Sequence, residues 1–213
     1  MELPSLAFLL ARSHNRCVAI YTPPHFSVED LDIAHQVMRD HPFATLVSFA
    51  DGEPWISHAP ISLINGILVG HLARANPHTK FFDDDHPLTC IFHGPHAYVS
   101  PRWYDTPNQV PTWNYVVVHA QGRPQVLGDE ETVRALLDLV AGYDPELTFE
   151  PEPLARQAKG VVAFRMEIDR LDCKFKMSQN KTEADRQGVI AGLLERDGPD
   201  DQAVATWVDS SYR

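Results

Sequence analysis

Two tight-turn dipeptides early in the chain constrain its fold more than any other feature. Asp51-Gly52 and Asn65-Gly66 each separate runs that are rich in β-branched and apolar residues. Such dipeptides favour the two-residue turns of β-hairpins, because both turn positions need a positive φ. The sequence therefore predicts that the three flanking runs, 44–49, 55–63 and 67–73, are strands joined as consecutive hairpins.

Further strand-like and helix-like runs extend this pattern. The remaining predicted strands cover 88–93, 97–100, 112–120, 124–127, 161–168 and 171–177, with a turn at Gly94-Pro95. Apolar residues at helical spacing predict three helices, which begin after Ser27, at Asp129 and after Thr182, each residue being a good N-cap. Many short strands with few helices favour a mainly antiparallel barrel or sandwich over alternating βαβ units.

Composition excludes several classes of function. The 213 residues are 44% hydrophobic, which suits one globular domain, and they carry a formal charge of −11. That charge disfavours direct binding to nucleic acid or to anionic membranes. The three distant cysteines indicate reduced thiols. With no signal peptide and no apolar run long enough to span a bilayer, we expect a cytoplasmic protein. The common motifs of nucleotide-binding loops, serine hydrolases and zinc proteases are missing.

The strand predicted at 112–120 carries two different faces. Asn114 and Val116 alternate with Trp113, Tyr115 and His119, so the two sets point to opposite sides. The first set suits a core. The second is large and tipped with polar atoms, which suits a partner subunit or a planar ligand. The residues of this strand leave both alternatives open.

Two polar stretches have the composition of an anion site. In "GHLARANPHTK", the side chains of Arg74, Asn76 and Lys80 follow the end of a predicted strand, where a phosphate site or a solvated loop are the alternatives. In "FKMSQNKTEADR", cations and amides gather just before a predicted helix. Free N–H groups at a helix start favour anions, although simple helix capping also explains this stretch.

Histidine is abundant, with eleven residues. His58 and His71 lie on neighbouring predicted strands and could face one pocket. Each is either a hydrogen-bonded strand histidine or an axial ligand of haem.

Taken together, the motifs resemble the PaiB family of FMN-binding split-barrel proteins, whose members are labelled negative transcriptional regulators. The similar segments run in order from about Tyr21 to Leu194 and include "IYTPPHF", "HPFATLVSF", "GHLARANP", "GPHAYVSPRWY", "VPTWNY" and "KMSQNKTEADRQGVIAGL". The resemblance implies a six-stranded antiparallel split β-barrel with flanking helices over 21–194. Residues 1–20 are then an N-terminal extension, and 195–213 are a polar C-terminal tail.

The resemblance also implies a homodimer with FMN at the subunit interface. Arg74, Asn76 and Lys80 would lie near the FMN phosphate or ribityl chain. Trp113, Asn114 and Tyr115 would line the ring or the dimer side, so we expect Trp113 and Tyr115 to be buried only when a second subunit is present. Lys176, Ser178, Gln179, Asn180 and Arg186 would close the site.

Three functions follow from this resemblance. The first is an FMN-binding homodimer with a redox or regulatory role, for which no catalytic residue is assigned. The second is a haem-binding enzyme of the haem-degrading or N–N bond-forming type, with His58 or His71 as axial ligand. The third is indirect negative regulation of transcription, without direct DNA binding.

Overall fold

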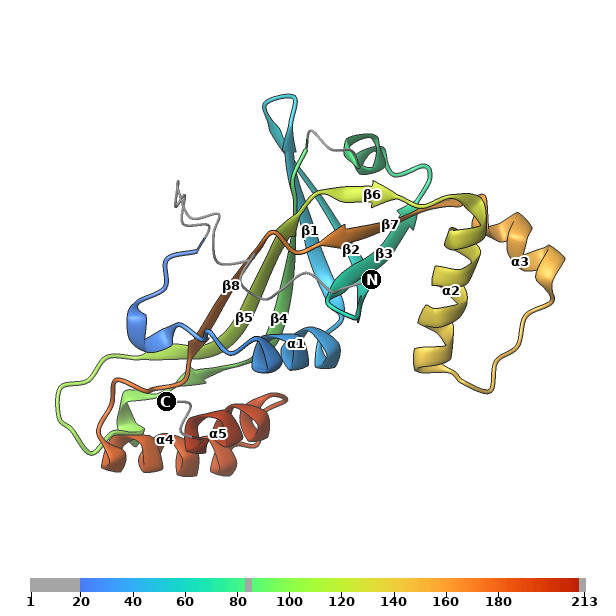
Figure 1. Ribbon diagram of the computed structural model, residues 1–213. Helices are drawn as coiled ribbons and strands as arrows, with labels where there is room; N and C mark the ends of the chain where they lie inside the picture. The colour runs from blue at the N-terminus through green and yellow to red at the C-terminus, as the bar shows by residue number, and fades with distance from the viewer. Residues whose placement is uncertain (1–19, 83–85, 211–213) are drawn as a thin grey trace, which may run out of the picture.

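The computed structural model describes residues 20–82 and 86–210, which form one strongly curved antiparallel sheet with helices around it (Figure 1). The sheet order is β6-β7-β3-β2-β1-β4-β5-β8. The strands are β1 Phe43–Ala50, β2 Glu53–Ile64, β3 Ile67–Ala73, β4 Leu88–Val99, β5 Thr112–Gly122, β6 Pro124–Val126, β7 Val161–Glu167 and β8 Arg170–Lys176. The predicted mainly β split-barrel class is confirmed, but the sheet has eight strands, not the six that the family resemblance implied.

Both predicted hairpins are present. Asp51 and Gly52 have φ values of 54° and 80°, and Asn65 and Gly66 have values of 50° and 82°. These are the left-handed conformations that a two-residue hairpin turn requires. The central strand, β2, pairs with β1 through residues 53–60 and with β3 through residues 61–64. The sheet therefore changes direction along β2, which is how it curls.

The turn predicted at Gly94-Pro95 is wrong. Residues 88–99 form one strand, β4, in which the register with β5 shifts between His93 and His96. Gly94 lies against β5 so closely that an added Cβ would be 2.9 Å from the Cβ of Val116. The dipeptide therefore makes a bulge inside a continuous strand, and the bulge increases the local twist.

The helices follow the predicted pattern with shifted starts. Helix α1, Leu31–Asp40, is capped by Asp30 instead of Ser27, since the Asp30 Oδ1 accepts hydrogen bonds from the backbone N–H of Asp32 (2.9 Å) and Ile33 (3.3 Å). Helix α2, Asp129–Tyr143, has its N-cap at Gly128, one residue before the predicted Asp129. Helix α4, Glu183–Arg196, is capped by Thr182 as predicted.

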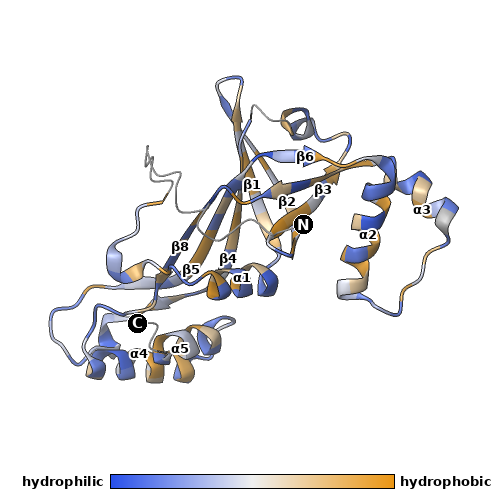
Figure 2. Cartoon of the chain, viewed as in Figure 1, coloured by the Kyte–Doolittle hydropathy of each residue, from blue (hydrophilic) through white to orange (hydrophobic). Residues whose placement is uncertain are grey.

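Two further helices lie outside the three that the sequence predicts. Helix α3, Pro151–Ala158, forms in the Pro-rich connection after α2. Helix α5, Asp201–Asp209, forms in the polar tail and buries Val204, Ala205 and Val208. Together with α4 it covers the end of the sheet near β4, as Figures 1 and 2 show.

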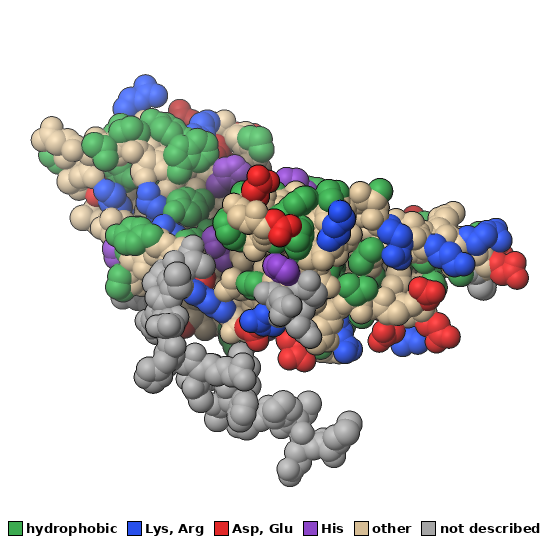
Figure 3. Space-filling view, turned by 90° about the horizontal axis from the view of Figure 1, so that it is seen from above, with side chains coloured by type: hydrophobic (Ala, Val, Ile, Leu, Met, Phe, Trp, Pro, Cys, Tyr) green, Lys and Arg blue, Asp and Glu red, His purple; other side chains and the backbone are tan. Residues whose placement is uncertain are grey.

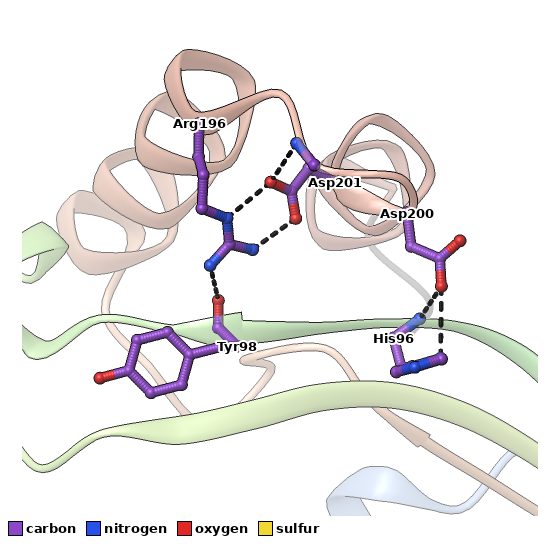
Figure 4. Close-up of polar contacts among 6 residues, drawn as sticks. His96, Tyr98, Arg196, Asp200 and Asp201 are labelled. Atoms are coloured by element: carbon purple, nitrogen blue, oxygen red, sulfur yellow. Dashed lines mark hydrogen bonds and ion pairs between the residues drawn. The ribbon is translucent and has the colours of Figure 1, made fainter.

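A charged clamp fixes these C-terminal helices to the sheet (Figure 4). Arg196 Nε donates to Asp201 Oδ2 at 2.7 Å, and Arg196 Nη1 donates to the carbonyl oxygen of Tyr98 at 2.9 Å. Asp200 Oδ2 accepts the backbone N–H of His96 at 3.1 Å. The hydrogen bond from Arg196 is the main cause that lowers the pKa of the Asp201 carboxyl group, and the burial of this group acts in the opposite direction.

The two sides of the sheet are covered differently. The concave side packs against α1 and contains the largest fully buried side chains, among them Phe92, Phe164 and Phe175. On the other side, which we call the outer face, α2 lies over part of β2, β3 and β7. The outer face of β1, β4 and β5 has no helix over it within residues 20–82 and 86–210.

The predicted extension at residues 1–20 lies, apart from its last residue, outside the described residues. Among the helices described, none is long and apolar enough to cross a membrane.

Candidate functional site

Alternation along β5 gives the two faces that the sequence predicted. Asn114 and Val116 are buried in the core, whereas Trp113 is exposed and Tyr115 is half-buried on the outer face. Cross-strand pairing places Trp113 opposite Tyr98 of β4, and Tyr115 opposite Lys176 of β8. The outer face therefore presents flat rings next to a cation.

Three lysines gather at the β8 edge of this face, and we call them the lysine cluster: Lys174, Lys176 and Lys181. Lys174 Nζ donates to the carbonyl oxygen of Tyr21 at 2.8 Å and lies 5.5 Å from the centroid of the Tyr115 ring. Lys176 Nζ donates to Thr112 Oγ1. Each of these cations therefore rests on a neutral oxygen.

Lys181 completes the cluster from the turn before α4. Its Nζ donates to Gln109 Oε1 at 2.6 Å and lies 4.7 Å from the centroid of the Tyr104 ring. Burial first, and then the positive charges of Lys174 and Lys181, lower the pKa of the Lys176 ammonium. Within the described part of the chain, no carboxylate forms an ion pair with any of the three.

The turn between β8 and α4, which carries Lys181 of the cluster, is fixed by a buried polar pair. Asn114 Nδ2 donates to Ser178 Oγ at 3.0 Å, and both residues are buried. Ser178 has a φ of 61°, a left-handed conformation that is uncommon for residues other than glycine. Gln179 uses its whole amide inside the same turn, accepting from Met177 N at 2.7 Å and donating to the carbonyl oxygen of Phe175 at 2.6 Å.

The other predicted residues near this end are placed differently. Asn180 is exposed. Arg186, in the first turns of α4, pairs with Glu183, and its Nε is buried without a hydrogen bond. The cluster residues Lys174 and Lys181 were absent from the predicted binding set. Strand alternation could have identified Lys174, because it lies two residues from Lys176 and therefore on the same face.

The predicted phosphate residues after β3 form a second, separate group. Asn76 caps the 3₁₀ helix η3, Pro77–Phe81: its Oδ1 accepts from His78 N at 3.0 Å and its Nδ2 donates to Ser57 Oγ at 3.0 Å. Arg74 donates to two backbone carbonyls near the start of β7. Lys80 is exposed on η3 and forms no hydrogen bond or ion pair within the described residues.

The two groups lie far apart in one copy of the chain. Four strands, β2, β1, β4 and β5, separate β3 from β8 in the sheet. Figure 1 also shows η3 and the turn before α4 at opposite ends of the sheet. One copy therefore does not bring Lys80 and the lysine cluster together.

The two candidate haem ligands have different surroundings. His58 is exposed on the outer face, with its Nδ1 3.2 Å from Thr45 Oγ1. His71 is half-buried and lines a small pocket beneath α2, where burial lowers the pKa of its imidazole. His58 is not among the residues that line that pocket.

His119 lies between Ile91 and Asp172 on the outer face. Burial is the main cause that lowers the pKa of its imidazole, with Asp172 acting in the opposite direction. Among the described residues, no group of three or more His, Cys, Asp or Glu side chains could hold a metal ion.

Comparison with known proteins identifies relatives over most of the chain. The family model described as "Putative FMN-binding domain" matches residues 20–170. The chain is 29% identical over 205 residues to "Protease synthase and sporulation protein PAI 2" of Bacillus subtilis, covering 91% of this chain and 99% of that one. It is 27% identical over 216 residues to an uncharacterized protein of Emericella nidulans, AN0679, with coverage of 76% and 86%.

Solved structures share the fold at lower identity. The FAD and heme binding protein from Mycobacterium smegmatis superimposes with a TM-score of 0.60 at 16% identity, covering 70% of this chain and 73% of that one. The conserved hypothetical protein Rv2991 from Mycobacterium tuberculosis gives a TM-score of 0.56 at 14% identity, covering 77% and 95%. These likenesses confirm the split-barrel fold.

Proposed function

The chain belongs to the "Putative FMN-binding domain" family, as its resemblance to the PaiB family predicted, and from this premise we propose that it is a homodimer that holds FMN between its two copies. The lysine cluster is the observation that carries the proposal. Three lysines without a carboxylate partner among the described residues, in a chain with a formal charge of −11, form a concentrated positive site that fits a phosphate dianion.

The rings beside the cluster suit the rest of the cofactor. Trp113 and Tyr115 present flat faces on the same side of the sheet as Lys176. Aromatic side chains stack well on a planar heterocycle, and lysine ammonium groups bind phosphate oxygens as point charges. When bound, FMN supplies redox chemistry, and the protein supplies binding, orientation and electrostatics.

The exposed hydrophobic residues of the outer face support the proposal that the protein is a homodimer. Phe43, Phe49 and Ile56 are 66%, 67% and 59% exposed, and Trp113 is 52% exposed. Figure 3 shows hydrophobic side chains gathered together with histidines on one part of the molecule, away from the α2–α3 end. Soluble monomers rarely expose large contiguous apolar patches. A two-fold partner would bury this patch, and it could bring Lys80 of one copy to the lysine cluster of the other.

The decisive experiment compares FMN with riboflavin, which has the same ring and no phosphate. We expect FMN to bind the full-length protein in the micromolar range or tighter, and riboflavin to bind at least about tenfold more weakly, because a charge-assisted contact contributes more than about 1.4 kcal/mol. Lys176→Gln and Lys181→Gln should lower FMN affinity toward that of riboflavin and leave riboflavin binding unchanged.

Lys159→Gln is the matched control, because Lys159 lies beyond α3 at the opposite end of the sheet. Its FMN affinity should equal that of the unmodified protein. Equal affinity for FMN and riboflavin, or an equal effect of all three substitutions, would refute the assignment of the phosphate to the lysine cluster.

Haem is the second candidate, favoured by the exposed imidazole of His58 on the same face. Titration with haem followed by absorbance tests it. A specific Soret band that is lost in His58→Ala, but retained in Lys176→Gln, would replace FMN with haem as the ligand.

The dimer is tested by analytical ultracentrifugation. We expect a mass of twice the 24.0 kDa chain, and a shift toward the monomer in Phe49→Glu, since a charge would then be buried in the interface. A monomer at all concentrations would remove the dimer from the proposal and leave FMN binding to be judged by its own titration.

A further inference from the structure

A cavity of about 190 Å³ lies between helices α2 and α3 and the β6–β7 edge of the sheet, away from the proposed cofactor site. Its walls are largely aliphatic. They come from Val126 at the end of β6 and Leu127 after it, Val133 of α2, Ala155 and Ala158 of α3, and Val161, Val162 and Ala163 of β7. An apolar cavity of about 150 Å³ is large enough to bind benzene, so this one has room for a body of similar size.

Arg74 supplies a fixed cation to the wall of the cavity. Its Nε donates to the carbonyl oxygen of Lys159 and its Nη2 donates to that of Val161, each at 2.7 Å. These two bonds hold the guanidinium plane in one orientation. A guanidinium has five N–H donors, and the other three have no partner among the described residues.

A fixed guanidinium edge with free donors matches a carboxylate, which it can bind through two parallel hydrogen bonds. Lys159 adds a second cation to the lining, and Asp129 and Glu130 at the start of α2 add two carboxylates. Arg74, Asp129 and Glu130 are all exposed, so water screens each of these charges, but two backbone carbonyl groups hold the Arg74 guanidinium in place.

We propose that this cavity binds a small apolar molecule that carries a carboxylate, with Arg74 as the anchor and the aliphatic walls around the apolar body. The site is separate from the FMN site. It gives Arg74, which the family resemblance would place near the FMN phosphate or ribityl chain, a different ligand.

Isothermal titration of the full-length protein with benzoate and benzamide tests the proposal. The two probes have the same ring, but only benzoate is charged. We expect benzoate to bind and benzamide to bind at least about tenfold more weakly, because it lacks the charge-assisted pair. FMN-free and FMN-saturated protein should bind benzoate equally.

Two variants locate the binding. Ala155→Leu places a larger side chain at the cavity wall and should weaken benzoate binding at least about tenfold, because the apolar volume is then filled. Ala141→Leu, the same change at an exposed position of α2 that does not line the cavity, is the control and should bind normally. Arg74→Lys keeps the charge but loses the fork, and it should also weaken binding.

Several outcomes would overturn the proposal. The proposal fails if benzoate does not bind at millimolar concentration, if benzamide binds as tightly as benzoate, or if Ala155→Leu binds benzoate as tightly as the unmodified protein. Competition between benzoate and FMN, or between benzoate and inorganic phosphate, would assign the cavity to the cofactor instead. Loss of FMN binding in the lysine-cluster variants, with benzoate binding intact, would show that the two proposals stand independently.

Discussion

Ser178 is the residue at which two opposing effects on stability can be separated. It is 3% exposed, it has a φ of 61°, and its hydroxyl is the partner of Asn114, which is fully buried. Ser178→Ala and Ser178→Gly both remove the hydroxyl and leave the Asn114 amide without that partner. Such a loss costs about 1–3 kcal/mol of the free energy of unfolding.

The two substitutions differ in the backbone. Alanine keeps the left-handed penalty of an L-residue, roughly 1–2 kcal/mol, whereas glycine has none. Glycine therefore relieves this backbone penalty, but its greater conformational freedom in the unfolded chain offsets about 0.4–1 kcal/mol of the stabilisation. We therefore expect Ser178→Ala to be destabilised by about 2 kcal/mol and Ser178→Gly by about 1 kcal/mol.

Urea denaturation at pH 7, with the slope compared among variants, measures both values. Asn108→Gly is the control: Asn108 has a φ of 58° but is exposed, so its substitution removes no buried partner and should not destabilise the protein. Equal destabilisation of Ser178→Ala and Ser178→Gly would refute the backbone part of the reasoning. Unchanged stability in both variants would refute the claim that the hydrogen bond between Asn114 and Ser178 stabilises the protein.

The remaining predictions concern the core and the effect of pH. Phe164→Ala should cost about 3–5 kcal/mol in urea denaturation, because Phe164 is fully buried, and Phe49→Ala, on the exposed outer face, should cost far less in the monomer. Gly192→Ala should cost about 1–3 kcal/mol, since the new Cβ would lie 2.3 Å from the Trp103 indole; unchanged stability would mean that the indole moves away freely. Burial lowers the pKa of His78 in the folded protein below its ordinary value of 6.5. At a pH between the folded and the unfolded pKa, the unfolded chain therefore binds more protons than the folded chain, and the free energy of unfolding falls as the pH drops below about 6.5. His78→Gln should reduce that slope between pH 7 and pH 5, and an unchanged slope would contradict the role of His78.

The sequence by itself determined the parts of the fold that depend on local chemistry. The Asp-Gly and Asn-Gly dipeptides predicted both hairpins, because the need for a positive φ is a property of two adjacent residues. The alternation along 112–120 separated the buried Asn114 from the exposed Trp113, because the strand period is local too. The same locality explains the error at Gly94-Pro95: the dipeptide reads as a turn, but pairing with β5 on either side makes it a bulge.

Only the tertiary structure decided which polar groups meet. Arg74 is held by carbonyl groups 85 and 87 residues further along the chain, and that contact places it at the α2–α3 cavity. Lys181 joins Lys174 and Lys176 because the loop before β5 supplies Gln109 as its partner. Such contacts depend on how elements far apart in the sequence pack together. The pattern of residues along the chain does not specify the distance between those elements in the folded protein. The family and the hairpins could therefore be predicted from the residues, whereas the lysine cluster and the cavity required the folded chain.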